Sequence, residues 1–183
     1  TAVVCIVLGM GMPSAVIYIV LSVIAAPALI EAGVGKMSAH MFLFYFGMLS
    51  MITPPVCLAT IAAASVAGTN FWQTGWAGVR LGFVAYIVPF LFVFYPELVF
   101  EGSAGAIIAV MVKSTIGVVI LCYCVAGFMY DRLGAVERLI LGVAGLAVLA
   151  APYDSGVGLG IIAAALAVTA IMFTRGRARR GAE

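Results

Sequence analysis

Long uncharged stretches, separated by short polar connectors, set the pattern of this chain. Residues 2–30 carry no charged side chain, and a second stretch, from Met37 to Val79, contains no Asp, Glu, Lys or Arg. An apolar stretch of about 20 residues is long enough for a helix to cross the hydrocarbon core of a bilayer. The pattern therefore predicts an all-α polytopic membrane protein, because a β-barrel would show short segments of alternating polarity instead.

The connectors divide the chain into helical segments. These are predicted at 2–27, 39–50, 56–66, 77–95, 102–130, 139–152 and 156–174, with loops at 131–138 and 153–155. Ser38 precedes the second segment and is a candidate N-cap, since its hydroxyl could accept a hydrogen bond from a first-turn amide. Three aromatic residues before the fourth segment, Phe71, Trp72 and Trp76, fit the aromatic belt of a membrane interface.

A glycine- and proline-rich sequence, Gly9-Met-Gly-Met-Pro-Ser14, interrupts the first segment soon after its start. Half a span, a break and a second apolar piece are typical of a re-entrant hairpin, because a full crossing needs about 20 apolar residues. A single kinked spanning helix with Met12-Pro13 near its middle is an equally good interpretation. Both stay open on the residues alone.

A second interruption, Thr53-Pro54-Pro55, lies inside the longest uncharged stretch. Two consecutive prolines remove two backbone donors and clash with the preceding turn, so a helix cannot pass through them unbroken. In hydrocarbon, the carbonyls freed in this way must find other partners. One interpretation is a simple proline kink, and the other is a broken helix whose bare carbonyls face an ion or substrate.

The composition indicates a membrane environment, and the distribution of charge predicts an orientation in the membrane. The chain is 66% hydrophobic and 9% charged, which excludes a water-soluble domain. It opens at Thr1 in apolar sequence, so we expect a piece of a longer protein and identify no signal peptide. The arginine-rich tail 175–180 favours a cytoplasmic C-terminus. Counting the predicted spans back from this tail places Arg80, Arg132 and Arg138 on the cytoplasmic side of the membrane. The same count places Lys36, Glu97, Glu101 and Asp154 on the outer side.

The residue inventory argues against an enzyme. His40 is the only histidine, and there is no Ser/His/Asp set, no carboxylate pair within a span and no His/Cys metal cluster. The arginine tail is best explained as a signal for membrane topology, and the next explanation is a contact with anionic lipid. Both explain the tail better than a nucleic-acid site does. Lys113 lies inside a predicted span, and we expect it to snorkel to an interface. We expect no nucleic-acid partner and no cofactor other than a coupling ion.

Both interruptions suit the transport of an ion. Glycine supplies backbone freedom, proline exposes carbonyls, and serine and threonine supply hydroxyls, so neutral oxygens gather without a buried carboxylate. A half-helix starting at Val56 could also direct its N-terminus at a substrate carboxylate. The candidate substrate- or ion-binding residues are Gly9, Gly11, Met12, Pro13, Ser14, Gly47, Ser50, Ile52, Thr53, Pro54, Pro55 and Val56. The candidate Na⁺ ligands among them are Gly11, Ser14, Thr53 and Val56.

These motifs resemble the large membrane subunit of tripartite ATP-independent periplasmic (TRAP) transporters. The resemblance rests on Gly9–Ser14 and on Phe46-Gly-Met-Leu-Ser-Met-Ile-Thr-Pro-Pro-Val56. Ala62–Thr69, Thr74-Gly-Trp, Arg80-Leu-Gly and Tyr86-Ile-Val-Pro-Phe90 look specifically like the fused permeases that partner with TAXI-type binding proteins. The resemblance covers Thr1 to Glu101, and Cys57 departs from it, since relatives often carry glycine there.

The resemblance implies an elevator-type secondary transporter with inverted repeats, in a bacterial or archaeal cytoplasmic (inner) membrane. Residues 1–101 would be the second repeat, with an outer hairpin and a broken helix, and residues 102–183 a C-terminal transmembrane extension. The implied activity is Na⁺-coupled uptake of a small organic anion delivered by a periplasmic solute-binding protein. The implied partners also include the lipid bilayer and the remaining N-terminal part of the permease. The alternative hypothesis is a non-transporting membrane scaffold or assembly subunit, in which both interruptions are packing kinks.

Overall fold

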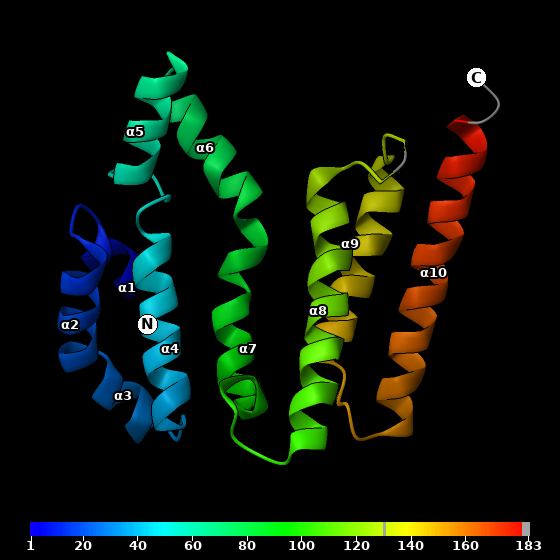
Figure 1. The fold of residues 1–183 in the computed structure, drawn as a ribbon, viewed down its shortest axis with the longest axis horizontal. Coiled ribbons are helices and arrows are strands. Elements are labelled where there is room, and N and C mark those ends of the chain that lie inside the picture. The colour runs from blue at the N-terminus through cyan, green and yellow to red at the C-terminus, as the bar shows by residue number, and fades with distance from the viewer. Residues whose placement is uncertain (130, 181–183) are drawn as a thin grey trace. The chain divides into compact units, whose positions relative to one another are not determined.

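The computed structural model describes residues 1–129 and 131–180, with side chains as far as Thr174, and these residues form an all-helical fold (Figure 1). It contains two compact units, Thr1–Glu101 and Gly102–Glu183, which are described separately. The predicted end of a span at Tyr130 and the arginine side chains of the tail lie outside the described part.

The first unit contains seven α-helices and two 3₁₀ turns among the described residues. They are α1 (Ala2–Gly9), α2 (Ser14–Ile24), α3 (Ala26–Glu31), α4 (Lys36–Leu49), α5 (Leu58–Ala67), α6 (Phe71–Leu81), η1 (Phe83–Tyr86), α7 (Val88–Phe94) and η2 (Pro96–Val99).

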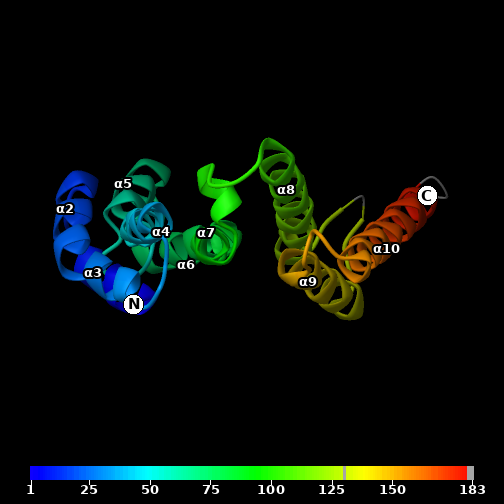
Figure 2. The same cartoon turned by 90° about the horizontal axis from the view of Figure 1, so that it is seen from below.

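Helix α4 is the centre of the first unit. It packs against α1, α2, α3 and α7, and in Figure 2 α2 and α3 lie on one side of it and α6 and α7 on the other. Its inward face joins α1 and α2 in one buried core, which contains Cys5, Ile17, Leu21, Ala25, Ala26, Phe42, Leu43, Phe46 and Leu49. The two interruptions therefore lie at the end of a packed three-helix arrangement.

Helices α1 and α2 are the two arms of a helical hairpin. Both arms pack along α4, and Cys5 of α1 shares the buried core with Ile17 of α2. The turn between them contains Gly11 at φ +79°, a conformation that suits glycine because it has no Cβ. Of the two interpretations of Gly9–Ser14, the geometry favours a hairpin over one kinked spanning helix (Figure 1).

The predicted N-cap at Ser38 is wrong. Helix α4 begins at Lys36, with Gly35 at the N-cap position. Ser38 is buried, at 1% exposure, on the same face as Ala39 and Phe42. The helix begins two residues before the serine, because burial of this face in the core stabilises it by more than a capping hydrogen bond of about 1 kcal/mol.

The predicted span 77–95 begins earlier than expected and is bent. Asn70 caps α6 by accepting hydrogen bonds from the amides of Trp72 (2.8 Å) and Gln73 (3.4 Å), so the aromatic residues lie within the helix and not before it. The axis turns by 64° between Phe71–Leu81 and Phe83–Phe94. Gly82 lies at the bend, and Pro89 lacks the N–H that a continuous helix would use there.

The second unit consists of three helices among the described residues, α8 (Ala104–Ala126), α9 (Ala135–Ala150) and α10 (Gly156–Arg180). Helix α9 starts inside the predicted loop 131–138, because Glu137 reaches back and accepts a hydrogen bond from the Gly134 amide at 2.9 Å. The predicted turn at 153–155 lies between α9 and α10, as expected. Helices α8 and α9 cross at Gly117 and Gly145, where each glycine faces a leucine of the other helix.

The expectation that Lys113 snorkels to an interface is wrong. Lys113 is 2% exposed, and its Nζ donates a hydrogen bond of 2.6 Å to the carbonyl of Ala151 at the end of α9. A reciprocal contact lies at the other end of the pair, where Arg138 of α9 donates to the carbonyls of Cys124 (2.9 Å) and Val125 (3.3 Å). Each helix of the pair thus supplies a cation to the C-terminal end of the other, where the helix dipole favours positive charge.

Two helices of the described part are long and apolar enough to cross a membrane, namely Ala104–Ala126 and the Gly156–Thr174 part of α10. The bent pair Phe71–Leu81 and Phe83–Phe94 makes a third candidate if it counts as one span. Helix α9 has 16 residues and is shorter than the helices that meet this criterion.

Candidate functional site

The hairpin tip and the end of α4 lie directly against each other. A Cβ built on Gly9 would stand 2.6 Å from Ser50 Oγ, and one built on Gly47 would stand 2.7 Å from the Cγ2 of Ile17 in α2. On the other side of the tip, a Cβ on Gly11 would meet Val56 at 3.4 Å. The structure therefore brings together the two interruptions that the sequence separates by about 40 residues.

Local hydrogen bonds end α4 at the predicted place. Ser50 Oγ donates to the Gly47 carbonyl at 2.6 Å, and Thr53 Oγ1 donates to the Leu49 carbonyl at 2.6 Å. These side chains bond carbonyls that the next turn of a continuous helix would have used. The prolines cannot donate, and the Pro54–Pro55 peptide bond is cis. The chain therefore leaves the helix at Ser50 and resumes it at Leu58.

The segment between the two half-helices leaves backbone oxygens without amide donors. The Ala59 amide donates across the break to the Met51 carbonyl at 3.1 Å. Within residues 1–129 and 131–180, the carbonyls of 52–56 accept no backbone hydrogen bond. Carbonyls of this kind need water, an ion or another segment as a partner when the bilayer surrounds them. The geometry thus offers a set of neutral oxygen acceptors beside the hairpin tip.

Helix α6 and η1 support the broken segment from the other side. Pro54 Cγ lies 3.0 Å from the position that a Cβ on Gly75 would take, and Ile52 Cδ1 lies 2.9 Å from that of Gly82. Tyr86 OH is 2.7 Å from Thr53 Oγ1. Gly75, Gly82 and Tyr86 thus contribute to the site, although no motif in the sequence predicted them there. Glycines seven residues apart lie on one face of a helix, so their spacing could have indicated a surface that backbone approaches closely.

The hydroxyl of Thr53 is nearly saturated by protein partners. Its single proton points to the Leu49 carbonyl, so the phenol of Tyr86 must donate the other hydrogen bond. One lone pair of the Thr53 oxygen remains for a further ligand. The threonine can therefore contribute one contact to an ion, and Tyr86 fixes where that contact points.

The other predicted residues take different positions around the break. Met12 and Ile52 pack against the core, Pro13 is the N-cap of α2, and Ser14 begins that helix in a half-buried position. Pro55 and Val56 are exposed. They open onto a pocket of about 580 Å³ whose other lining residues are Ile61, Ala64, Ser65, Gly68, Thr69 and Phe71.

Cys57, the position that departs from the TRAP pattern, is buried at 1% exposure and forms the N-cap of α5. Its Sγ lies 3.7 Å from the Cβ position of Gly75. The thiol thus packs towards α6, in the space that this glycine leaves open.

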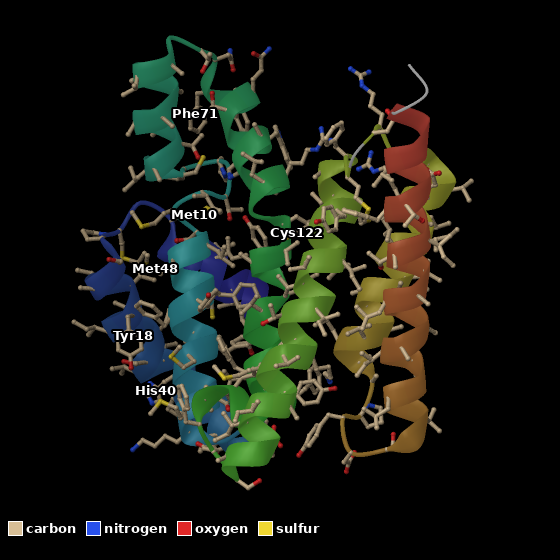
Figure 3. All side chains as sticks on the ribbon, turned by 45° about the vertical axis from the view of Figure 1, so that its right-hand side comes forward. Met10, Tyr18, His40, Met48, Phe71 and Cys122 are labelled. Atoms are coloured by element: carbon tan, nitrogen blue, oxygen red, sulfur yellow. The ribbon has the colours of Figure 1, made fainter. Side chains whose placement is uncertain are left out.

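The two interruptions themselves, residues 9–14 and 47–56, contain no charged side chain. Figure 3 labels Met10 of the hairpin turn and Met48 of the last turn of α4, both apolar. Farther along the same helices, Tyr18 OH and His40 Nδ1 are 3.1 Å apart, which ties α2 to α4. No group of three or more His, Cys, Asp or Glu side chains that could hold a metal occurs in the described residues. An ion here would rely on backbone and hydroxyl oxygens.

Comparison with known proteins identifies the family. Residues 1–107 match the family described as "Tripartite ATP-independent periplasmic transporter, DctM component". No match was found among curated proteins or among solved structures. The matched region contains the hairpin, the broken helix and the supporting α6. The chain therefore belongs to the DctM components of TRAP transporters, which makes it a multi-pass membrane transport protein and not an enzyme.

Proposed function

We propose that this chain is the part of a TRAP permease that couples Na⁺ entry to the uptake of a small organic anion. Membership of the DctM family implies a periplasmic binding protein as the partner that delivers the substrate. The observation that carries the proposal is the meeting of the hairpin tip and the broken helix, where the carbonyls of 52–56 have no backbone donors.

Na⁺ is the coupling ion that suits these oxygens. It is a hard cation and binds neutral carbonyl and hydroxyl groups without a buried carboxylate. The proposed ligands come from Gly11 and Ser14 of the hairpin and from Thr53 and Val56 of the broken segment. Thr53 contributes its remaining lone pair, while the other residues contribute carbonyls or, in Ser14, a hydroxyl.

The substrate would bind next to this ion. The remaining proposed contacts are Gly9, Met12, Pro13, Gly47, Ser50, Ile52, Pro54 and Pro55, which lie in or beside the two interruptions. In the first turn of α5 the amides of Ala59 and Thr60 already donate to backbone carbonyls, whereas the Leu58 amide has no backbone acceptor among the described residues. This amide and the positive end of the helix dipole attract a carboxylate. A carboxylate substrate therefore complements both the cation and this helix end.

The wider architecture proposed is that of an elevator transporter. Residues 1–101 form its second inverted repeat, and the N-terminal part of the permease supplies the matching repeat. Residues 102–183 form a C-terminal extension of the kind found in fused permeases with TAXI-type binding proteins. The chain lies in the cytoplasmic membrane of a bacterium or archaeon, with its C-terminus inside, as the arginine distribution favours.

The test uses the full-length permease in proteoliposomes, with its binding protein and a substrate identified by binding to that protein. Thr53→Ala combined with Pro54→Ala should raise the Na⁺ concentration for half-maximal uptake at least fivefold. The matched control is Thr115→Ala in α8, which removes the same type of hydrogen bond to a carbonyl four residues earlier (2.8 Å to Met111) at an exposed position.

Two outcomes decide between the hypotheses. An altered Na⁺ dependence in the Thr53/Pro54 variant, with normal dependence in the Thr115 variant, supports the ion site. Unchanged Na⁺-dependent uptake in both variants would remove the site assignment and favour packing kinks in a scaffold subunit.

A further inference from the structure

The two arms of the hairpin are held on α4 by different kinds of contact. Helix α1 carries aliphatic side chains, one cysteine and one glycine, so its packing on α4 is apolar. Helix α2 has three hydroxyl side chains, of which Ser22 donates within its own helix, to the Ile19 carbonyl at 2.8 Å. Among the described residues, Tyr18 is the hairpin side chain that hydrogen bonds with a side chain of α4.

The ring of Tyr18 contacts two side chains of α4 that are one helical turn apart. Its centroid is 6.0 Å from that of His40, at an interplanar angle of 62°, and 5.8 Å from that of Phe44, at 82°. Its hydroxyl oxygen lies 3.1 Å from Nδ1 of His40, and Figure 3 shows the two side chains next to each other. One of the two groups donates and the other accepts, according to the tautomer of the imidazole. The ring contacts and the hydrogen bond together fix where α2 lies along α4.

This contact also restrains the rotation of α2 about its own axis. Ile17 and Leu21 bury the neighbouring stripe of α2 in the core, but apolar packing has no preferred direction. A hydrogen bond weakens steeply when its angle departs from linearity, so it restrains the rotation more strictly. Ser14 precedes Tyr18 by four residues and therefore lies on the same face of α2, one turn closer to the hairpin tip. The direction of the Ser14 side chain thus depends on the Tyr18 contact.

We propose that Tyr18 and His40 are positioning residues for the Na⁺ site. Their hydrogen bond holds α2 at one rotation on α4, and this places the Ser14 hydroxyl and the turn at Gly11 beside the broken segment. This role rests on the proposed function, in which Ser14 and Gly11 supply ligands to the ion. Tyr18 and His40 act through Ser14 and do not bind the ion themselves.

The first test measures uptake by the full-length permease in proteoliposomes, with its binding protein. Tyr18→Phe removes the hydroxyl and keeps the ring, and should raise the Na⁺ concentration for half-maximal uptake about two- to tenfold. The maximal rate at saturating Na⁺ should stay unchanged, because the hydroxyl does not contact the substrate. The control is Tyr45→Phe in α4. The Tyr45 ring packs on Phe92, and its hydroxyl has no hydrogen-bond partner among the described residues, so this variant should keep the normal Na⁺ dependence.

Substitutions of His40 separate positioning from a purely structural role. His40→Leu removes the polar partner and should match Tyr18→Phe, and the double variant should be no worse than either. His40→Asn places an amide near the position of Nδ1, where it can donate or accept, and should restore a Na⁺ dependence close to normal. Equal defects in the two His40 variants, or a lower maximal rate with an unchanged Na⁺ concentration for half-maximal uptake, would overturn the positioning role.

A measurement without Na⁺ or substrate separates this role from the proposed function. In the detergent-solubilised full chain with its four native cysteines replaced, Ser14→Cys introduces a thiol at a half-buried position. Adding Tyr18→Phe should raise the rate of its reaction with a maleimide about threefold or more, because α2 then rotates more freely, while adding Tyr45→Phe should not. Equal rates with and without Tyr18→Phe would overturn the positioning role. Uptake that does not depend on Na⁺ in the unsubstituted permease would instead contradict the proposed function, and the labelling rates would still decide the contact.

Discussion

Gly9 at the end of α1 lies so close to Ser50 at the end of α4 that a Cβ on the glycine would stand 2.6 Å from the serine Oγ and 3.0 Å from its Cβ. The backbone at the end of α1 thus contacts a side chain at the end of α4. Ile17 of α2 completes the contact, at 3.2 Å from the same position. The absence of a side chain at Gly9 is what allows the hairpin tip to reach the broken helix.

Gly9→Ala should separate the tip from the broken helix and lower Na⁺-dependent uptake several-fold. The added methyl group overpacks the contact, which costs about 1–3 kcal/mol of stability. Ser50→Gly in the same chain should restore part of the uptake, because it removes the atoms that the methyl group meets. Gly160→Ala, which adds a methyl group where no atom lies within 4 Å, is the control for uptake and for thermal stability.

Tyr86→Phe should weaken Na⁺ binding, less than Thr53→Val does. The phenol is the donor that orients the Thr53 oxygen, and such a hydrogen bond contributes about 0.5–1.5 kcal/mol. In a double-mutant cycle on the Na⁺ concentration for half-maximal uptake, the double variant should behave like Thr53→Val alone. Strictly additive effects of the two substitutions would show that Tyr86 does not act through Thr53.

The sequence predicted the positions of the two interruptions because prolines act locally. Thr53-Pro54-Pro55 ends a helix through missing donors and steric clash, and α4 and α5 stop and start around it. The hairpin could not be distinguished from a kink, since that choice depends on packing along α4. The contact of Gly9 with Ser50 is tertiary, and nothing local indicates which residue a glycine faces.

Other differences have the same origin. Ser38 has the right residue type and position for a cap, yet the core stripe of α4 covers it. Lys113 has a side chain long enough to snorkel, but the end of α9 supplies a carbonyl within reach. Tyr86 joins the site only because α6 bends at Gly82, which brings η1 beside Thr53. In each case a partner distant in sequence outweighs the local preference.

Gly117→Ala should destabilise the second unit by about 1–3 kcal/mol through overpacking. A Cβ there would lie 2.5 Å from Leu149 Cδ2 and 3.3 Å from the Gly145 carbonyl oxygen. Thermal unfolding of the detergent-solubilised chain measures the effect. Gly105→Ala in the same helix meets no atom within 4 Å and should be neutral or stabilising. Adding Leu149→Ala to Gly117→Ala should recover less than the whole loss, because the Gly145 backbone remains close.

Arg138→Gln should destabilise the second unit by about 1.5–3 kcal/mol, the range for hydrogen bonds to charged groups. The guanidinium bonds the Cys124 and Val125 carbonyls, which a helix end leaves without amide donors. Arg132→Gln removes the same charge from an exposed position nearby and should change stability by less than about 0.5 kcal/mol. Equal effects of the two substitutions would assign the loss to net charge and not to capping.

A cysteine at Asp154 tests the orientation that the arginine distribution predicts. In a chain whose four native cysteines are replaced, Asp154→Cys should react with a membrane-impermeant maleimide on intact cells, because Asp154 is exposed and the arginine distribution predicts its turn outside. Arg132→Cys, also exposed but predicted inside, should react only after the membrane is opened. The reverse labelling pattern would invert the orientation. It would then make the hairpin enter the membrane from the cytoplasmic side, opposite to the side on which a periplasmic binding protein delivers substrate.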